Sequence, residues 1–80
     1  MRAFVTVTPK AGVLDPQGKA IAHALANLGF DNVTDVRAGK VFELDVSGTD
    51  AARTRSQAED MARRLLANTV IESFKVEIAA

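Results

Sequence analysis

The residues best suited to chemistry lie between Gly12 and Lys19, in the run Gly-Val-Leu-Asp-Pro-Gln-Gly-Lys. Two glycines followed by a lysine, placed after a strand-like segment, suggest a loop that holds phosphate oxygens with backbone amides and the lysine. Such a loop separates its glycines by four residues and places Ser or Thr after the lysine. Here five residues separate Gly12 from Gly18, and Ala20 follows Lys19, so the spacing and the missing hydroxyl both argue against nucleotide binding.

Asp15 and Pro16 favour a structural role for the same run. A carboxylate at position 15 would repel an anion, but it can accept a hydrogen bond from a free amide in a first helical turn. Proline fits the first helical position because its fixed φ is helical and its missing N–H has no partner there. Gly12 permits a left-handed turn, and Gly18 lets a neighbouring backbone come close. The run therefore predicts a helix start.

No other residues form a catalytic or metal-binding set. His23 is the sole histidine, cysteine is absent, and the carboxylates are scattered along the chain. A metal site or a nucleophile with its base needs several such groups in one place. Arg37 and Lys40 flank a predicted turn and could contact an anion or an acidic partner. We predict a chain without catalytic, cofactor-binding or metal-binding residues.

Composition excludes several classes of partner. The 80 residues carry ten basic and ten acidic side chains, which removes the positive surface expected of a general nucleic-acid binder. No apolar run is long enough to cross a bilayer, and the first residues lack a signal-peptide core. We expect one cytoplasmic domain over residues 1–80, without nucleic-acid or membrane partners. A chain this short buries little surface, so self-association would add stability.

Hydrophobic periodicity predicts the elements that must position these residues. Alternation indicates strands over residues 3–8 and 72–78, with Ala3, Val5 and Val7 on one face of the first. Helical spacing indicates helices from about 16 to 28 and from about 51 to 67. The first helix has an apolar stripe of Ile21, Leu25 and Leu28. The second has a stripe of Ala58, Met61, Ala62, Leu65 and Leu66.

The segment 32–46 contains two strand-like runs around Arg37-Ala-Gly-Lys40. If Ala38 and Gly39 form a two-residue turn, Val36 pairs with Val41 and Asp35 pairs with Phe42. Gly39 could instead mark a bulge in one long bent strand. The pattern favours the hairpin modestly over the bent strand.

The element order β-α-β-β-α-β predicts an α+β two-layer sandwich. Its sheet has three or four mostly antiparallel strands, with both helices on one face. The helix-free face then carries Phe4, Val36 and Val41. Exposed apolar residues on that face indicate contact with another copy or another subunit.

The run Val13-Leu-Asp-Pro-Gln-Gly-Lys-Ala-Ile21, followed by Leu28-Gly-Phe30 and Val36-Arg-Ala-Gly-Lys40, resembles the PurS family across essentially the whole chain. PurS is the small subunit of phosphoribosylformylglycinamidine (FGAM) synthase. The resemblance implies a non-catalytic, homo-oligomeric protein of de novo purine biosynthesis that joins a glutaminase (PurQ) to an ATP-dependent synthetase (PurL). The assembly converts formylglycinamide ribonucleotide, glutamine and ATP to FGAM, glutamate, ADP and phosphate. ATP and Mg²⁺ then belong to the synthetase, and this chain helps ammonia transfer.

Two alternatives remain open on the residues alone. A βαββαβ domain could be a sensing module that binds a small molecule at a dimer interface. A small hydrolase of acylphosphatase type would need a glycine-rich loop with an arginine and an asparagine nearby. Asn27, Asn32 and Asn68 are not obviously placed for that chemistry.

Overall fold

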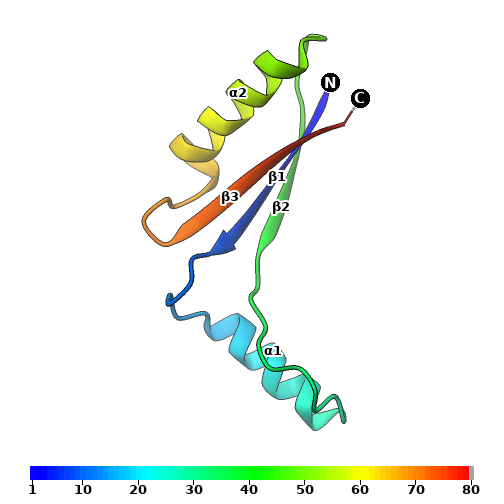
Figure 1. Ribbon diagram of the computed structural model, residues 1–80, viewed down its shortest axis with the longest axis vertical. Coiled ribbons are helices and arrows are strands. Elements are labelled where there is room, and N and C mark those ends of the chain that lie inside the picture. The colour runs from blue at the N-terminus through cyan, green and yellow to red at the C-terminus, as the bar shows by residue number, and fades with distance from the viewer. Residues whose placement is uncertain (80) are drawn as a thin grey trace.

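The computed structural model describes residues 1–79. Within them the element order is β1 (Arg2–Pro9), α1 (Pro16–Asn27), β2 (Lys40–Asp45), α2 (Ala51–Met61), a π-helical turn η1 (Ala62–Leu66) and β3 (Glu72–Ala79) (Figure 1). The predicted α+β class and antiparallel sheet are confirmed. In the same residues, neither helix is long and apolar enough to span a membrane.

The sheet has the order β2-β1-β3, with β1 antiparallel to both neighbours. Val5 lies opposite Phe42 of β2 and Val76 of β3. Since side chains alternate across a strand, this register places alternate apolar residues of all three strands on one face. They are Ala3, Val5, Val7, Phe42, Leu44, Phe74, Val76 and Ile78. The predicted shared face of Ala3, Val5 and Val7 is confirmed, since all three are buried.

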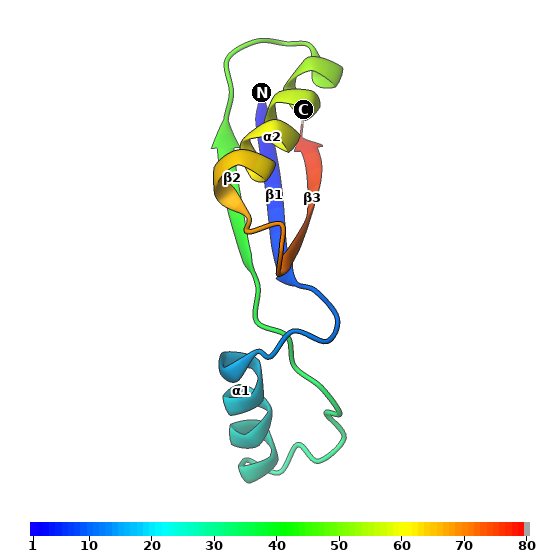
Figure 2. The same cartoon turned by 90° about the vertical axis from the view of Figure 1, so that its left-hand side faces the viewer.

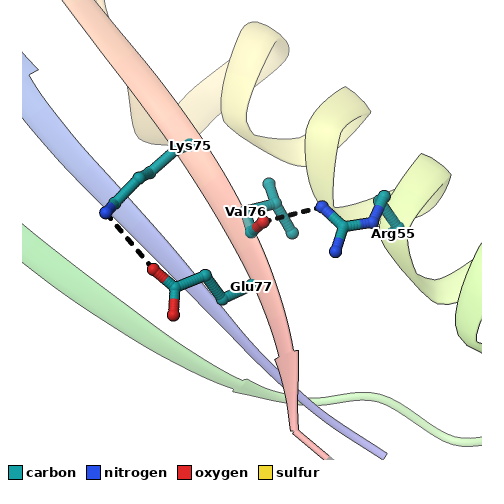
Figure 3. A network of polar contacts seen from close by, with 4 residues as sticks. All are labelled: Arg55, Lys75, Val76 and Glu77. Atoms are coloured by element: carbon teal, nitrogen blue, oxygen red, sulfur yellow. Dashed lines mark hydrogen bonds and ion pairs between the residues drawn. The ribbon is translucent and has the colours of Figure 1, made fainter.

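Helix α2 covers this face and packs on β1 and β3. Its buried residues are Thr54 and Ala58, and Ala62 continues the same row into η1. Arg55 Nη1 donates to the backbone oxygen of Val76 at 2.7 Å, which ties α2 to β3 (Figure 3). The small side chains in this row let the helix lie close to the sheet.

The π turn corrects the predicted stripe of the second helix. The Ala67 amide donates to the Ala62 oxygen, five residues back, at 2.9 Å. A π turn advances fewer degrees per residue than an α-helix, so it rotates the residues inside it. Leu65, inside the turn and predicted to face the core, is 83% exposed; Met61, also predicted to face the core, precedes the turn and is 40% exposed. Ala67 is buried in their place.

Helix α1 begins and ends where its sequence predicts. The Asp15 side chain caps the first turn, and Pro16 is the first helical residue. At the other end Gly29 has a φ of 99°. The Phe30 amide donates to the Leu25 oxygen at 3.0 Å, which closes the helix in a Schellman motif.

The position of α1 differs from the prediction that both helices cover one face. Figures 1 and 2 show that α1 lies beyond the end of the sheet where β1 ends and β2 begins. We call residues 10–39, which contain α1 and the segments that join it to β1 and β2, the arm. The molecule measures 47 × 26 × 14 Å because the arm extends it along one axis. Helix α2 is therefore the helix that covers the sheet.

The predicted hairpin between Val36 and Val41 is wrong. Residues 33–39 form no strand; they are the last part of the connection from α1 into β2, whose first residue, Lys40, pairs with Val7. The chain instead passes through Gly39 in an extended conformation, which is closer to the second prediction, one long bent strand. A side chain at Gly39 would lie 2.6 Å from the Val7 oxygen, so the glycine permits close passage over β1. The element order is accordingly β-α-β-α-β.

Candidate interaction surfaces and the arm junction

Asp15 occupies the position where a phosphate loop would hold its anion. One carboxylate oxygen accepts from the Gly18 amide at 3.0 Å, and the other accepts from the Ala38 amide at 2.7 Å. The side chain is buried, at 8% exposure. Because the protein's own carboxylate takes these donors, the helix-start interpretation of this run is confirmed. The hydrogen bond from Ala38 also links the two segments of the arm that lead to the sheet, one from β1 and one to β2.

Arg37 closes the same junction from the other side. Its guanidinium donates to the Lys10 oxygen at 2.7 Å and to the Val13 oxygen at 3.0 Å. Both acceptors belong to the connection between β1 and α1, whereas Arg37 belongs to the connection between α1 and β2. A planar guanidinium can hold two carbonyls at once, which a lysine cannot do with the same geometry. The structure thus gives Arg37 an intramolecular role that sequence reasoning missed.

Gly18 completes the junction by letting two backbones touch. A Cβ atom at this position would overlap the Val36 backbone oxygen and lie 2.6 Å from a carboxylate oxygen of Asp15. The predicted close approach of a neighbouring backbone at Gly18 is confirmed. We call Asp15, Gly18 and Arg37, together with the backbone groups that they contact, the clamp.

The clamp lowers the pKa of the Asp15 carboxyl. The largest cause is the hydrogen bond from the Gly18 amide, followed by the bond from the Ala38 amide, and the Arg37 charge acts in the same direction. Burial opposes these contributions without cancelling them. All three favourable contacts stabilise the ionised form.

The lowered pKa predicts a loss of stability in acid. A carboxyl whose pKa is lower in the folded state contributes stability that is fully present above its unfolded pKa, about 4, and is lost as the pH falls through the folded pKa. We expect unfolding midpoints in urea to fall less between pH 7 and pH 3 for Asp15→Asn than for the wild type. Parallel pH curves for the two proteins would show that the clamp carboxylate contributes nothing.

The helix-free face is more polar than predicted. Phe4 is half-buried there, and Val41 is 60% exposed on the neighbouring strand. Their pairing partners place them diagonally, with Phe4 opposite Glu43 and Thr6 opposite Val41. Charged pairs surround them: Arg2 with Glu43 at 3.1 Å, and Lys75 with Glu77 at 3.3 Å (Figure 3).

Val36 does not join Phe4 and Val41. It lies in the extended segment before β2, half-buried, with its oxygen against Gly18. The expected three-residue apolar patch is therefore reduced to two. Lys40 is exposed at the start of β2, with Nζ 5.7 Å from the centre of the Phe42 ring. The structure thus separates the five predicted interface residues into Phe4 and Val41 on the sheet, Lys40 at its rim, and Val36 and Arg37 at the junction.

Apolar residues of the arm form an exposed set that the sequence pattern assigned to the core. Ile21 is 39% exposed and Leu28 is 73% exposed, although their stripe predicts a core-facing side. The other large apolar residues exposed in the arm are Leu14, Phe30 and Val33. An apolar stripe indicates that one side of a helix is buried, but the stripe does not identify the surface that covers that side.

A shallow hollow lies beside the first turn of α2. Ser47, Thr49, Arg53 and Gln57 are among its lining residues. The Asp50 carboxylate accepts from the Arg53 amide at 3.2 Å, so it occupies a donor that a bound anion would need. Within residues 1–79, no group of three or more His, Cys, Asp or Glu could hold a metal ion. The exposed apolar residues of the arm and sheet favour contact with another protein.

Comparisons with known proteins agree with this arrangement. Residues 2–80 match the family model PurS, phosphoribosylformylglycinamidine (FGAM) synthase. The PurS subunit from Synechocystis sp. is 46% identical over 79 residues, covering 99% of this chain and 77% of the relative. The structure of B. subtilis PurS has a TM-score of 0.84 at 40% identity, covering 99% and 98% of the two chains. A chain of PurLQS from Thermotoga maritima has a TM-score of 0.83 at 26% identity, covering 95% and 94%.

Proposed function

The chain belongs to the PurS family of FGAM synthase subunits, and from this premise we propose that it joins a glutaminase of PurQ type to a synthetase of PurL type. The observation that carries the proposal is the likeness of the whole chain to a chain of the Thermotoga maritima PurLQS assembly. In this role the chain binds both partners and helps to position the route along which ammonia passes from the glutaminase to the synthetase. ATP and Mg²⁺ act in the synthetase.

Self-association is part of the same proposal. The exposed apolar residues of the arm and the pair Phe4 and Val41 lie on different parts of the molecule, so one set can contact a second copy while the other contacts a partner subunit. We assign Phe4, Val41 and Lys40 to the surface that docks on a partner subunit. A small apolar centre surrounded by polar side chains is typical of non-obligate interfaces between proteins.

Reconstitution tests the proposal. Without this chain, the rate of glutamine-dependent FGAM synthesis by a glutaminase and synthetase pair from the same organism should fall about tenfold or more. Synthesis from added ammonium salt should persist. Phe4→Glu and Val41→Glu together should weaken assembly, because two carboxylates would be buried at the interface without partners. Thr8→Glu, an exposed position on the same face of β1, is the matched control. Full glutamine-dependent activity without the chain would refute the proposed function.

A further inference from the structure

The hydrogen bonds near the two ends of β1 show which way its backbone groups point. Met1 and Val46 exchange two bonds at 2.8 Å: the Met1 amino group donates to the Val46 oxygen, and the Val46 amide donates to the Met1 oxygen. Because the backbone groups of a central strand point alternately to its two neighbours, odd-numbered residues of β1 bond to β2 and even-numbered residues bond to β3. The bond from the Lys10 amide to the Ile71 oxygen, at 2.8 Å, agrees with this alternation, since Ile71 directly precedes β3.

The same alternation determines which backbone groups β3 presents outward. Val76 lies opposite Val5, whose backbone groups point to β2. The amide and the carbonyl of Val76 therefore point away from β1, as do those of Phe74 and Ile78. Since β3 stands at one end of the strand order β2-β1-β3, these groups lie along an outer edge of the sheet. Backbone groups along such an edge can pair with a strand of another molecule.

The side chains of β3 give this edge little protection. The residues whose backbone groups point outward are apolar and pack on the core. Lys75 and Glu77 alternate with them, so their side chains lie on the helix-free face, where they pair with each other at 3.3 Å (Figure 3). An apolar edge strand of eight residues is a favourable site for strand addition unless a charge or a covering segment prevents it.

Arg55 of α2 reaches this edge. Its Nη1 atom donates to the Val76 oxygen at 2.7 Å, and Val76 is the middle one of the three residues with outward backbone groups (Figure 3). The guanidinium therefore occupies the acceptor that the amide of an added strand would need. Its positive charge lies at the same place, and a strand that displaced it would remove its hydrogen-bond partner.

We propose that Arg55 closes the outer edge of β3 against the addition of a further strand. The proposal concerns this edge alone and does not depend on the partner subunits. Arg55 also ties α2 to β3, and the two roles have opposite consequences for hydrogen exchange. Loss of a tie alone loosens the helix and speeds exchange of the amides beneath it. Loss of the block lets strands add, which slows exchange of the outward amides.

Hydrogen exchange of the wild-type protein, followed residue by residue by NMR, tests the orientation of β3. Amides that bond to β1, at Lys75 and Glu77, should exchange about tenfold or more slowly than the outward amides of Phe74 and Val76. This measurement requires no variant. Protection of the outward amides equal to that of Lys75 and Glu77 would mean that the edge is already paired, which would overturn the proposal.

Substitutions of Arg55 test the block itself. Arg55→Met keeps a long side chain and removes both the donor and the charge. Sedimentation velocity should give this variant a mass about twofold or more above that of the wild type at the same concentration, with slower exchange at Phe74 and Val76. Arg55→Lys keeps a positive charge at the edge and should retain the wild-type size. The matched control is Arg63→Met, which removes an arginine from an exposed position of η1 and should also leave the size unchanged.

Three further results would overturn the proposal. The first is an Arg55→Met protein of wild-type size. The second is a larger species in which the amides of Phe74 and Val76 exchange faster than in the wild type, because such a species would have associated through a loosened core. The third is an Arg55→Lys or Arg63→Met protein that associates as fully as Arg55→Met. All these measurements use the isolated chain, so their outcome is independent of the glutamine-dependent synthesis that tests the proposed function.

Discussion

Gly18→Ala is expected to lower the free energy of unfolding by about 1–3 kcal/mol, the range found when a methyl group is forced into a filled space. Alanine is the better helix former by about 1 kcal/mol, so propensity alone predicts the opposite sign. The contact decides the outcome, because the new Cβ would overlap the Val36 oxygen and crowd the Asp15 carboxylate. Urea unfolding of the isolated protein measures the change.

Lys19→Ala is the control for this change, since it alters the next residue of α1 at an exposed position. Its effect should stay within about 0.5 kcal/mol. Displacement of residues 36–38 would also remove the hydrogen bond from the Ala38 amide to Asp15. A Gly18→Ala protein as stable as the wild type would show that the Val36 backbone moves away without cost.

Val5→Ala is expected to destabilise the protein by about 2–3 kcal/mol, through lost burial and the cavity that remains. Val5 is fully buried at the centre of β1, between Phe42 and Val76 on the neighbouring strands. In a domain of this size such a loss lowers the melting temperature by roughly 4–8 °C per kcal/mol. Thermal unfolding followed by circular dichroism measures it.

Val41→Ala provides the comparison within the same sheet, because Val41 is 60% exposed on the opposite face. Both changes remove the same atoms and reduce strand propensity, so their difference reports burial. We expect Val41→Ala to cost less than about 1 kcal/mol. Equal losses at the two positions would mean that the helix-free face is as tightly packed as the core.

Elements with short-range causes were predictable from the sequence. The start of α1 follows from Asp15 and Pro16, and its end follows from Gly29. The inward faces of β1 and β3 follow from strict alternation, which has one solution for each strand. Each of these signals lies within a few residues of the structure that it specifies.

The arm junction could not be predicted, because its partners are far apart in the chain. Arg37 contacts oxygens 24 and 27 residues earlier. The acceptors are backbone carbonyls, which every residue has, so no pattern of side chains marks them. The hairpin prediction failed for this reason: Ala38 and Gly39 resemble a turn locally, but the Ala38 amide is bound by Asp15 and Gly39 passes over β1.

The amino-acid sequence by itself determined the start and end of α1, the inward faces of β1 and β3, the absence of a fitting phosphate loop and the family. Each depends on residue types at fixed short spacings. The tertiary structure alone decided that α1 extends away from its own sheet, that Arg37 and Asp15 hold it there, and that Leu65 turns outward at η1. An apolar stripe requires burial but does not specify the surface that buries it. That choice depends on long-range contacts to backbone groups.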